Sequence, residues 1–309
     1  MSVFDLTQPA LDERLEQLAA LAGRTRRVED LSGGLTNRNV KVTTDDGVYV
    51  ARISEDNAED LDIDRAAEAA NSRAAAEAGV GAPVVESRPD LGLLLIGFID
   101  GVTMNDATFR GEGFAGRAAK AMRQLHQGPR FVNDFDMFAR QPRYRERCRS
   151  QGFHIADGYD AHAETFARIR RALAVNDEGT VPCNNDLLAE NFIDDGEKVW
   201  LIDYEYSGNN DPCFELGNTW TECKLDPEHL DELVESYFGE VRPDKVARAR
   251  LQSVVSQYGW ALWGFIQSAV SPLDFDFWSW GMERYEGAAS AMTSSDLPRL
   301  LEEVTYGAS

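Results

Sequence analysis

Three polar residues, spread over two neighbouring segments, constrain this chain more than any other feature. The stretch PCNNDLLAENF (182–192) places Asp186 and Asn191 five positions apart, and the apolar run VWLI (199–202) leads directly into Asp203. Taken singly, an Asp or Asn here is more typical of a turn. Phosphoryl transfer needs a carboxylate that orients the acceptor hydroxyl, together with hard oxygen ligands for Mg²⁺. The order and spacing predict such a magnesium-nucleotide site, with Asp186 as the catalytic carboxylate and Asn191 and Asp203 as metal ligands.

Length and composition set the broad class of protein. A chain of 309 residues is long enough for two lobes and a substantial core, and no apolar run approaches the roughly 20 residues that span a membrane. The N-terminal stretch lacks the basic-then-apolar layout of a signal peptide. Four cysteines lie far apart without a C-x-x-C pair, which is typical of free thiols in a reducing compartment. We therefore expect a cytoplasmic protein with no membrane insertion.

The charge balance is strongly acidic. There are 53 acidic and 31 basic residues, for a formal net charge of −22. A solubility surface is the simplest interpretation, because net charge informs solubility rather than fold. The charge argues against nucleic acid as a partner and favours a cationic small molecule. ATP must then be bound by a local basic patch together with a metal ion.

The hydrophobic periodicity changes along the chain. A small strand-rich part precedes a larger, mainly helical part, which predicts an α+β fold with a nucleotide-binding lobe over residues 1–100 and a catalytic, acceptor-binding lobe over 101–309. The expected elements of the first lobe are an amphipathic helix over 6–23, strands within 28–53 with a hairpin turn at 45–47, an alanine-rich helix over 60–79 and two strands within 82–101.

A glycine turn and a basic strand predict the nucleotide end of the site. In LSGGLTNRNVKV (31–42), glycines let the backbone approach phosphates closely, although a Gly-Gly pair alone is more often a simple turn. The next strand carries Arg52 among apolar neighbours, where a cation needs a partner, and Glu68 on the following helix supplies one. The residues assigned to ATP in the turn are Ser32, Gly33, Gly34, Leu35, Thr36 and Asn37.

Longer motifs carry a family resemblance. They are LHQGP (125–129), NNDLLAENF (184–192), LIDYEYSGNNDPCFELGNTWTE (201–222) and WALWGFIQS (260–268). With the glycine turn, they make the chain resemble the choline/ethanolamine kinase branch of the aminoglycoside phosphotransferase-like superfamily, which shares the bilobal protein-kinase fold. The resemblance covers nearly the whole chain and implies a kinase that uses ATP and Mg²⁺.

The chain departs from the family pattern at two positions. Asn184 stands where the family usually has a histidine, and Glu215 stands where aspartate is common. The resemblance gives that histidine a bracing role, and asparagine offers both a donor and an acceptor for the same purpose. Because Asp186, Asn191 and Asp203 all remain, we expect a working enzyme. Glu205 is a further candidate metal ligand, directly or through water, or it hydrogen-bonds within its loop.

The acceptor site is predicted from aromatic residues near the C-terminus. Trp260 and Trp263 are three positions apart and share one helical face, and aromatic faces bind cations. The resemblance places Trp260, Trp263 and Trp280 at the choline cage and Glu222 at its acidic residue, with Trp220 nearby. Tryptophans in a helical lobe are otherwise usually core residues.

Several functions stay open at this point. The leading hypothesis is an ATP- and Mg²⁺-dependent kinase that phosphorylates the hydroxyl of choline or a related amino alcohol. Ethanolamine, thiamine, an aminoglycoside or a sugar are alternative acceptors on the same scaffold. A non-catalytic nucleotide-binding scaffold, in which Asn184 marks lost activity, is the alternative from another class.

Overall fold

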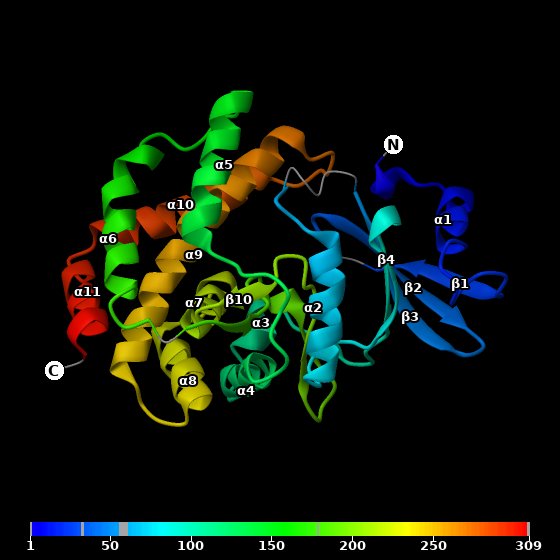
Figure 1. The fold of residues 1–309 in the computed structure, drawn as a ribbon, viewed down its shortest axis with the longest axis horizontal. Coiled ribbons are helices and arrows are strands. Elements are labelled where there is room, and N and C mark those ends of the chain that lie inside the picture. Colours follow the sequence, from blue (N-terminus) through cyan, green and yellow to red (C-terminus); the bar gives the residue numbers. More distant parts are fainter. Residues whose placement is uncertain (1, 32–33, 56–60, 178, 308–309) are drawn as a thin grey trace.

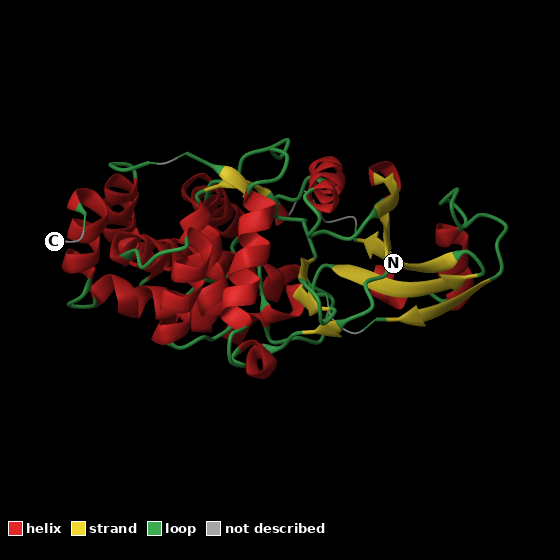
Figure 2. Ribbon diagram, turned by 90° about the horizontal axis from the view of Figure 1, so that it is seen from below, coloured by secondary structure: helices red, strands yellow, loops and turns green. Residues whose placement is uncertain are grey.

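The computed structural model describes residues 2–31, 34–55, 61–177 and 179–307. A sheet-rich part that includes the N-terminus lies beside a larger helical part that includes the C-terminus (Figure 1). A view turned by 90° shows the same two parts side by side (Figure 2). The predicted α+β architecture with a small β-rich lobe and a larger helical lobe is confirmed.

The first lobe is built on a five-stranded antiparallel sheet with the order β1-β2-β3-β5-β4. The strands are β1 (Arg26–Asp30), β2 (Asn37–Thr44), β3 (Gly47–Ser54), β4 (Val84–Arg88) and β5 (Leu93–Gly97). The hairpin between β2 and β3 closes with Thr44 opposite Gly47, at the predicted turn. Alternation of side chains buries Val40 and Val42 on one face of β2. All five strands lie before residue 101, where the sequence predicts the second lobe to begin.

The N-terminal helix is shorter than predicted. α1 (Gln8–Leu15) ends eight residues before the expected end, and residues 16–23 form turns instead. The amides of Ala19 and Ala20 donate to the Glu86 carboxylate rather than to helix carbonyls, at 2.9 and 2.8 Å. The apolar residues of this segment are buried all the same, because four of its leucines pack against the sheet: Leu11, Leu15, Leu18 and Leu21.

The alanine-rich helix links the two lobes. α2 (Arg65–Glu77) begins five residues later than predicted, where the Asp64 side chain accepts hydrogen bonds from the first-turn amides of Ala66 and Ala67. The helix ends before Gly79, whose φ of +81° suits glycine. Figure 1 shows α2 between the sheet and the helical lobe, and Ala75 shares a core cluster with residues of that lobe.

The second lobe contains nine α-helices among the described residues. They are α3 (Asp106–Phe109), α4 (Phe114–His126), α5 (Met137–Gln151), α6 (Ala163–Leu173), α7 (Pro212–Glu222), α8 (Pro227–Phe238), α9 (Pro243–Val270), α10 (Phe277–Thr293) and α11 (Leu297–Tyr306). The long α9 is buried along most of its length and packs against α7, α10 and α11. Within the described ranges, no helix combines the length and apolar character needed to cross a bilayer.

Short strands and 3₁₀ turns shape the surface of this lobe that faces the sheet. β6 (Val102–Thr103), β8 (Phe192–Asp194) and β9 (Val199–Leu201) form one small sheet, and β7 (Val181–Cys183) pairs with β10 (Gly208–Asn210) in another. In this lobe the 3₁₀ turns are η4 (Tyr159–His162) and η5 (Ala189–Asn191), whereas η1 (Val3–Asp5) and η3 (Pro89–Leu91) belong to the first lobe. The loops after β7 and β9 carry the polar residues singled out from the sequence.

Candidate active site

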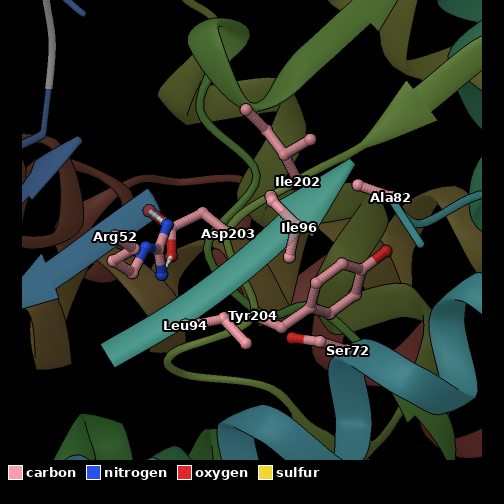
Figure 3. A pocket seen from close by; sticks show the side chains of 8 residues that line it. All are labelled: Arg52, Ser72, Ala82, Leu94, Ile96, Ile202, Asp203 and Tyr204. Carbon is pink, nitrogen blue, oxygen red and sulfur yellow. Dashed lines mark hydrogen bonds and ion pairs between the residues drawn. The ribbon is translucent and has the colours of Figure 1, made fainter. Parts of the chain in front are cut away.

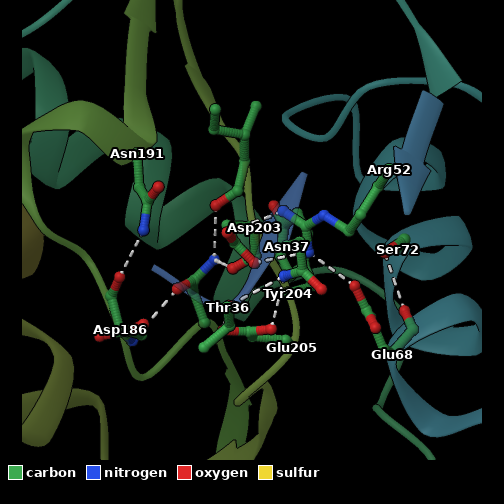
Figure 4. Close-up of polar contacts among 12 residues, drawn as sticks. Thr36, Asn37, Arg52, Glu68, Ser72, Asp186, Asn191, Asp203, Tyr204 and Glu205 are labelled. Carbon is green, nitrogen blue, oxygen red and sulfur yellow. Dashed lines mark hydrogen bonds and ion pairs between the residues drawn. The ribbon is translucent and has the colours of Figure 1, made fainter. Parts of the chain in front are cut away.

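Asp186 lies in the loop between β7 and β8, half-buried. No hydrogen bond among the described residues reaches its carboxylate, whereas its backbone carbonyl accepts the Nδ2–H of Asn191 at 2.7 Å (Figure 4). Burial raises the pKa of Asp186 well above its usual range, and the charges of Asp203, Glu205 and Glu222 raise it further. This carboxylate is therefore free to meet a ligand and sits in an acidic surrounding.

The β8–β9 hairpin sets the distance between Asn191 and Asp203. Asn191 precedes β8, Asp203 follows β9 by two residues, and the Ile202 amide donates to the Asn191 carbonyl at 3.0 Å. Asp203 has a φ of +64°, a left-handed backbone conformation that costs about 1–2 kcal/mol outside glycine. Such a conformation persists only where surrounding contacts impose it.

Asn184 supplies part of that constraint. This fully buried side chain donates through Nδ2 to the carbonyls of Ile202 and Asp203, at 3.0 and 2.8 Å. Its Oδ1 accepts the backbone amide of Asp186 at 3.1 Å. The two loops are thus joined through one amide group, which is the bracing role expected of the residue that replaces histidine.

A second set of buried polar groups supports the loop of Asp186 through the neighbouring residue Asn185. Asn185, with a φ of +69°, donates its backbone amide to Glu215 at 2.8 Å. Glu215 also lies 3.2 Å from His126, whose other ring nitrogen contacts the Tyr237 hydroxyl at 2.8 Å. His126, Cys183 and Glu215 lie close enough to hold a metal ion. Since His126 and Glu215 already have partners in the loop and core, we interpret the set as a brace.

A network of charges lines the interface of the two lobes (Figure 4). Arg52 on β3 forms a 2.7 Å ion pair with Glu68 on α2, as predicted from the sequence. Arg52 also pairs with both carboxylate oxygens of Asp203, each at 2.7 Å. Although burial lowers the pKa of Arg52, the carboxylates of Asp203, Glu68 and Glu205 outweigh it and raise that pKa. The cation is therefore permanently charged where the strand meets the Asp203 loop.

Arg65, which the sequence reasoning missed, extends this network. Its Nη1 bonds to Glu68 at 2.8 Å and to Glu205 at 3.2 Å. Its Nε and Nη2 are buried and have no hydrogen-bond partner among the described residues. Its position at the first turn of α2, three residues before Glu68, was the available sequence signal.

Glu205 connects the metal-side loop to the glycine turn. Its carboxylate accepts the Thr36 hydroxyl at 2.7 Å and the Asn37 side-chain amide at 2.8 Å. Gly34 has a φ of +98°, and an added Cβ would lie 2.8 Å from the Asn37 carbonyl, so this turn requires glycine. Leu35 packs against the core cluster around α9 and α10. Ser32 and Gly33, also predicted to contact ATP, lie outside the described residues.

A small cavity lies where the two lobes meet (Figure 3). Arg52 and Asp203 lie on its wall, and most of its other lining side chains are apolar: Ala82, Leu94, Ile96, Ile202 and Tyr204, with Ser72 from α2. Apolar walls exclude water from one side of the ion pair and so strengthen its electrostatic attraction.

The aromatic residues of the second lobe gather beside the Asp203 loop. Trp263 donates its indole N–H to the Tyr206 hydroxyl at 2.7 Å, and the Tyr206 ring meets Trp260 edge-to-face at 4.8 Å between centroids. The Trp280 ring lies 5.1 Å from that of Trp263. Trp260 has no hydrogen-bond partner for its buried indole N–H among the described residues. Tyr206, three residues after Asp203, was not singled out from the sequence.

Glu222 lies at the end of α7 and is buried with a basic partner. Arg284 on α10 donates to it through Nε at 3.0 Å and through Nη2. The Arg284 guanidinium carbon also lies 3.3 Å from the centroid of the Trp280 ring. Sequence reasoning named Glu222 and Trp280 but missed Arg284, four residues after Trp280 on the same helix.

Trp220 is not brought to the other predicted acceptor residues. It packs in the core cluster around α4, α7 and α8, whereas Trp260, Trp263 and Trp280 belong to the cluster around α9 and α10. Its indole N–H donates to the Asp226 carbonyl at 3.2 Å. Residues two positions apart on a helix are separated by about 200° around its axis. Trp220 and Glu222 therefore face opposite sides of α7. The structure corrects the placement of Trp220 with the acceptor residues.

Comparisons with known proteins bear on the family and the fold of the chain. The model of the phosphotransferase enzyme family matches residues 27–251. A relative from Arabidopsis thaliana named probable ethanolamine kinase is 26% identical over 293 residues, covering 84% of this chain and 77% of the relative. The crystal structure of a choline/ethanolamine kinase family protein from Mesorhizobium loti is 32% identical, with a TM-score of 0.85 over 98% of this chain and 100% of that one. The choline kinase LicA from Streptococcus pneumoniae shares the fold at 20% identity, with a TM-score of 0.76 over 92% and 99% of the two chains.

Proposed function

Because this chain belongs to the phosphotransferase enzyme family, we propose that it transfers the γ-phosphoryl group of ATP to the hydroxyl group of choline or of a related amino alcohol. The observation that carries the proposal is the join between the two loops: Asn184 and the β8–β9 hairpin hold Asp186, Asn191 and Asp203 in one site. Phosphoryl transfer needs a carboxylate that orients the acceptor hydroxyl and a pair of oxygen ligands that hold the metal ion at a fixed separation.

The polar groups divide into those for the acceptor and those for the nucleotide. Asp186, whose carboxylate is free, orients the acceptor hydroxyl and takes its proton as the new bond to phosphorus forms. Arg52 attracts the phosphates from β3, and Nε and Nη2 of Arg65, which lack a hydrogen-bond partner among the described residues, offer further donors. The Gly34 turn is linked to Arg65 through Glu205, which accepts from Thr36, Asn37 and Arg65.

The residues present fit a magnesium ion. Asn191 uses its side-chain N–H on the Asp186 carbonyl, which leaves its oxygen for a metal, and Asp203 adds a carboxylate whose oxygens each accept from Arg52 and keep a further lone pair. These are hard oxygen ligands of the kind that Mg²⁺ takes, and Glu205, two residues further on, is the third candidate ligand. Bound there, Mg²⁺ supplies positive charge that stabilises the transferring phosphoryl group.

The acceptor is inferred from the aromatic cluster and Glu222. Tyr206, Trp260, Trp263 and Trp280 offer ring faces and Glu222 a buried carboxylate, which suits a small cation better than a sugar. The relatives named for ethanolamine or choline support an amino alcohol. We further propose a cytoplasmic location, where ATP is available and the four free cysteines stay reduced.

The test is release of ADP from Mg-ATP in the presence of choline, ethanolamine, thiamine, an aminoglycoside or a hexosamine. Turnover with an amino alcohol that disappears in Asp186→Asn supports the proposal. Turnover with another acceptor moves the substrate assignment and keeps the kinase. ATP binding without turnover on any acceptor would favour the non-catalytic alternative.

A direct prediction concerns the metal side. Asp203→Ala is expected to remove Mg²⁺-dependent turnover while the protein stays folded, because Asp203 is a proposed ligand on a half-buried loop rather than part of the core. Turnover is measured across a Mg²⁺ titration and folding by circular dichroism. Turnover that persists in the variant at ordinary Mg²⁺ concentrations would show that the metal is bound elsewhere.

A further inference from the structure

The guanidinium of Arg284 lies between the Glu222 carboxylate and the Trp280 ring, where a cation is stabilised by both. The Arg284 side chain is 8% exposed and that of Glu222 is 2% exposed. Arg284 donates to Glu222 through Nε and Nη2 and donates through Nη1 to the Trp280 carbonyl at 3.1 Å, and its guanidinium carbon lies 3.3 Å from the centroid of the Trp280 ring. A buried carboxylate beside an indole face is a cation site, and here the chain fills it with its own guanidinium.

This filled site adjoins the catalytic carboxylate. The charges of Glu222 and Arg284 both act on Asp186, in opposite directions. Trp280 contacts Trp263, and Trp263 donates to Tyr206 in the Asp203 loop. The pair of Glu222 and Arg284 therefore lies on the side of the Asp186 loop that carries the proposed acceptor residues.

A cationic acceptor cannot simply be added beside Arg284. Two like charges at close range repel strongly in a partly desolvated site, and Glu222 offers only two oxygens, both engaged. The guanidinium has a second carboxylate at hand, since Nη1 lies 3.8 Å from Glu283, which is 58% exposed. If the Arg284 side chain moved from Glu222 to Glu283, the buried site would be free, and only this one side chain of α10 would have to move.

We propose that Arg284 is a specificity-determining residue: its guanidinium occupies the cation site formed by Glu222 and Trp280, and an acceptor binds there by displacing it. The inference rests on the proposed transfer to an amino alcohol. A displacing group must replace the N–H donors that Glu222 loses. A primary ammonium group has three such donors, whereas a quaternary ammonium group has none. The site thus selects an amino alcohol of the ethanolamine type over choline.

The size of the preference follows from the bonds involved. A charge-assisted hydrogen bond to a buried group is worth roughly tenfold or more in affinity. We expect wild-type kcat/KM to favour ethanolamine over choline by at least about that factor. In Arg284→Gln, Glu222 no longer has a guanidinium to lose, so the choline KM is expected to fall severalfold and the ATP KM to stay unchanged. An unchanged or increased choline KM in this variant would overturn the proposal.

A matched control separates specificity from stability. Arg248 is another buried arginine of the helical lobe, and its guanidinium pairs with Asp211 at 2.6 Å. Arg248→Gln removes a comparable buried ion pair on α9. We expect it to lower the melting temperature without shifting the ratio of ethanolamine to choline kcat/KM. An equal shift in both variants would mean that Arg284 acts only through stability.

A measurement on the wild-type protein keeps the proposal testable if Arg284→Gln does not fold. Calorimetric titration with ethanolamine and with choline, and a crystal structure with the tighter ligand, need no turnover. Tighter binding of ethanolamine, with Arg284 moved off Glu222, supports the displacement. The proposal is refuted if choline binds at least as tightly as ethanolamine, or if neither binds. It is also refuted if either amine binds elsewhere while Arg284 stays on Glu222. Displacement without turnover on any acceptor would sink the proposed kinase activity alone.

Discussion

Asn184 determines whether the catalytic loop is intact. Its fully buried side chain bonds to two carbonyls and one amide that are partly buried, and an unsatisfied buried group costs about 1–3 kcal/mol. We predict that Asn184→Ala lowers the melting temperature and lowers kcat about tenfold or more, because Asp186 and Asp203 lose their common anchor. The ATP KM should change little. Steady-state kinetics with Mg-ATP and the preferred acceptor test this.

Asn176, an exposed residue far from the site, offers a control that shares the two donated hydrogen bonds but not the accepted one. Asn176 donates through Nδ2 to the carbonyls of Val304 and Thr305, at 2.7 and 3.1 Å, in α11. Asn176→Ala should destabilise the protein without a selective loss of kcat. If both variants lose kcat equally, or if Asn184→Ala keeps full kcat, Asn184 is not the brace of the active site.

The sequence predicts some residues of the site and not others, for a physical reason. Arg52 and Glu68 were found because a lone cation on an apolar strand demands a partner within reach. Arg284 was missed because its carboxylate partner, Glu222, lies on another helix, α7. The packing that brings α7 and α10 together at this point cannot be predicted from the sequence of either helix. Trp220 was misplaced because proximity in sequence to Glu222 does not fix the side of the helix on which it lies.

At the scale of elements, the β8–β9 hairpin controls the spacing of the proposed metal ligands, and Asp195 stabilises the turn of that hairpin. The Asp195 carboxylate accepts the amides of Glu197 and Lys198, each at 2.8 Å, and the Trp200 indole N–H at 2.7 Å. Hydrogen bonds from Lys198, Trp200 and Glu197 lower the pKa of Asp195 to about 2. The folded protein therefore prefers the ionised carboxylate.

This shift gives a pH-dependent prediction. Because the folded pKa lies below the usual value of about 3.9, the stabilisation is complete above pH 4 and is lost as pH falls towards 2. Asp195→Asn should therefore be less stable than wild type near neutral pH, and the difference should shrink between pH 4 and 2. Urea unfolding at each pH measures it, with Glu197→Gln on the same turn as the control. A pH-independent difference would exclude the carboxylate as its source.

The crossing of α9 and α10 sets the distance between two aromatic residues of the proposed acceptor site. Trp263 precedes Gly264, and Trp280 precedes Gly281, so the two rings flank the point of closest approach. A Cβ on Gly264 would lie 2.8 Å from the Gly281 Cα and 2.9 Å from the Trp280 ring. No side chain fits there without separating the helices.

Gly264→Ala should therefore weaken acceptor binding selectively. We expect a loss of about 1–3 kcal/mol in unfolding free energy from overpacking, partly offset by the better helix propensity of alanine, and an increased acceptor KM with the ATP KM unchanged. Gly287→Ala on the partner helix α10 is the control, because its Cβ would meet only the end of the flexible Gln257 side chain of α9. Equal changes in the two variants would contradict the role of this crossing.

At the scale of the whole molecule, the two-lobe division followed from the sequence, whereas the bonds between the lobes did not. Periodicity distinguishes strands from helices locally, which is why the five strands and the alanine-rich helix were predicted. The ends of α1 and α2 were wrong because tertiary groups, the Glu86 carboxylate for α1 and the Asp64 cap for α2, decide where those helices stop and start. The bond from Thr36 to Glu205 joins residues 169 positions apart, beyond the reach of any local pattern.

The net charge of −22 makes the folded state sensitive to salt. Unpaired negative charges repel one another over the surface, and the screening length falls from about 30 Å at 0.01 M to about 3 Å at 1 M salt. We predict that the melting temperature rises as NaCl increases over that range, most steeply at the low end. KCl at equal ionic strength should give the same curve, because screening depends on charge and not on the ion. A melting temperature that falls with salt would show that attractive surface pairs outweigh the excess repulsion.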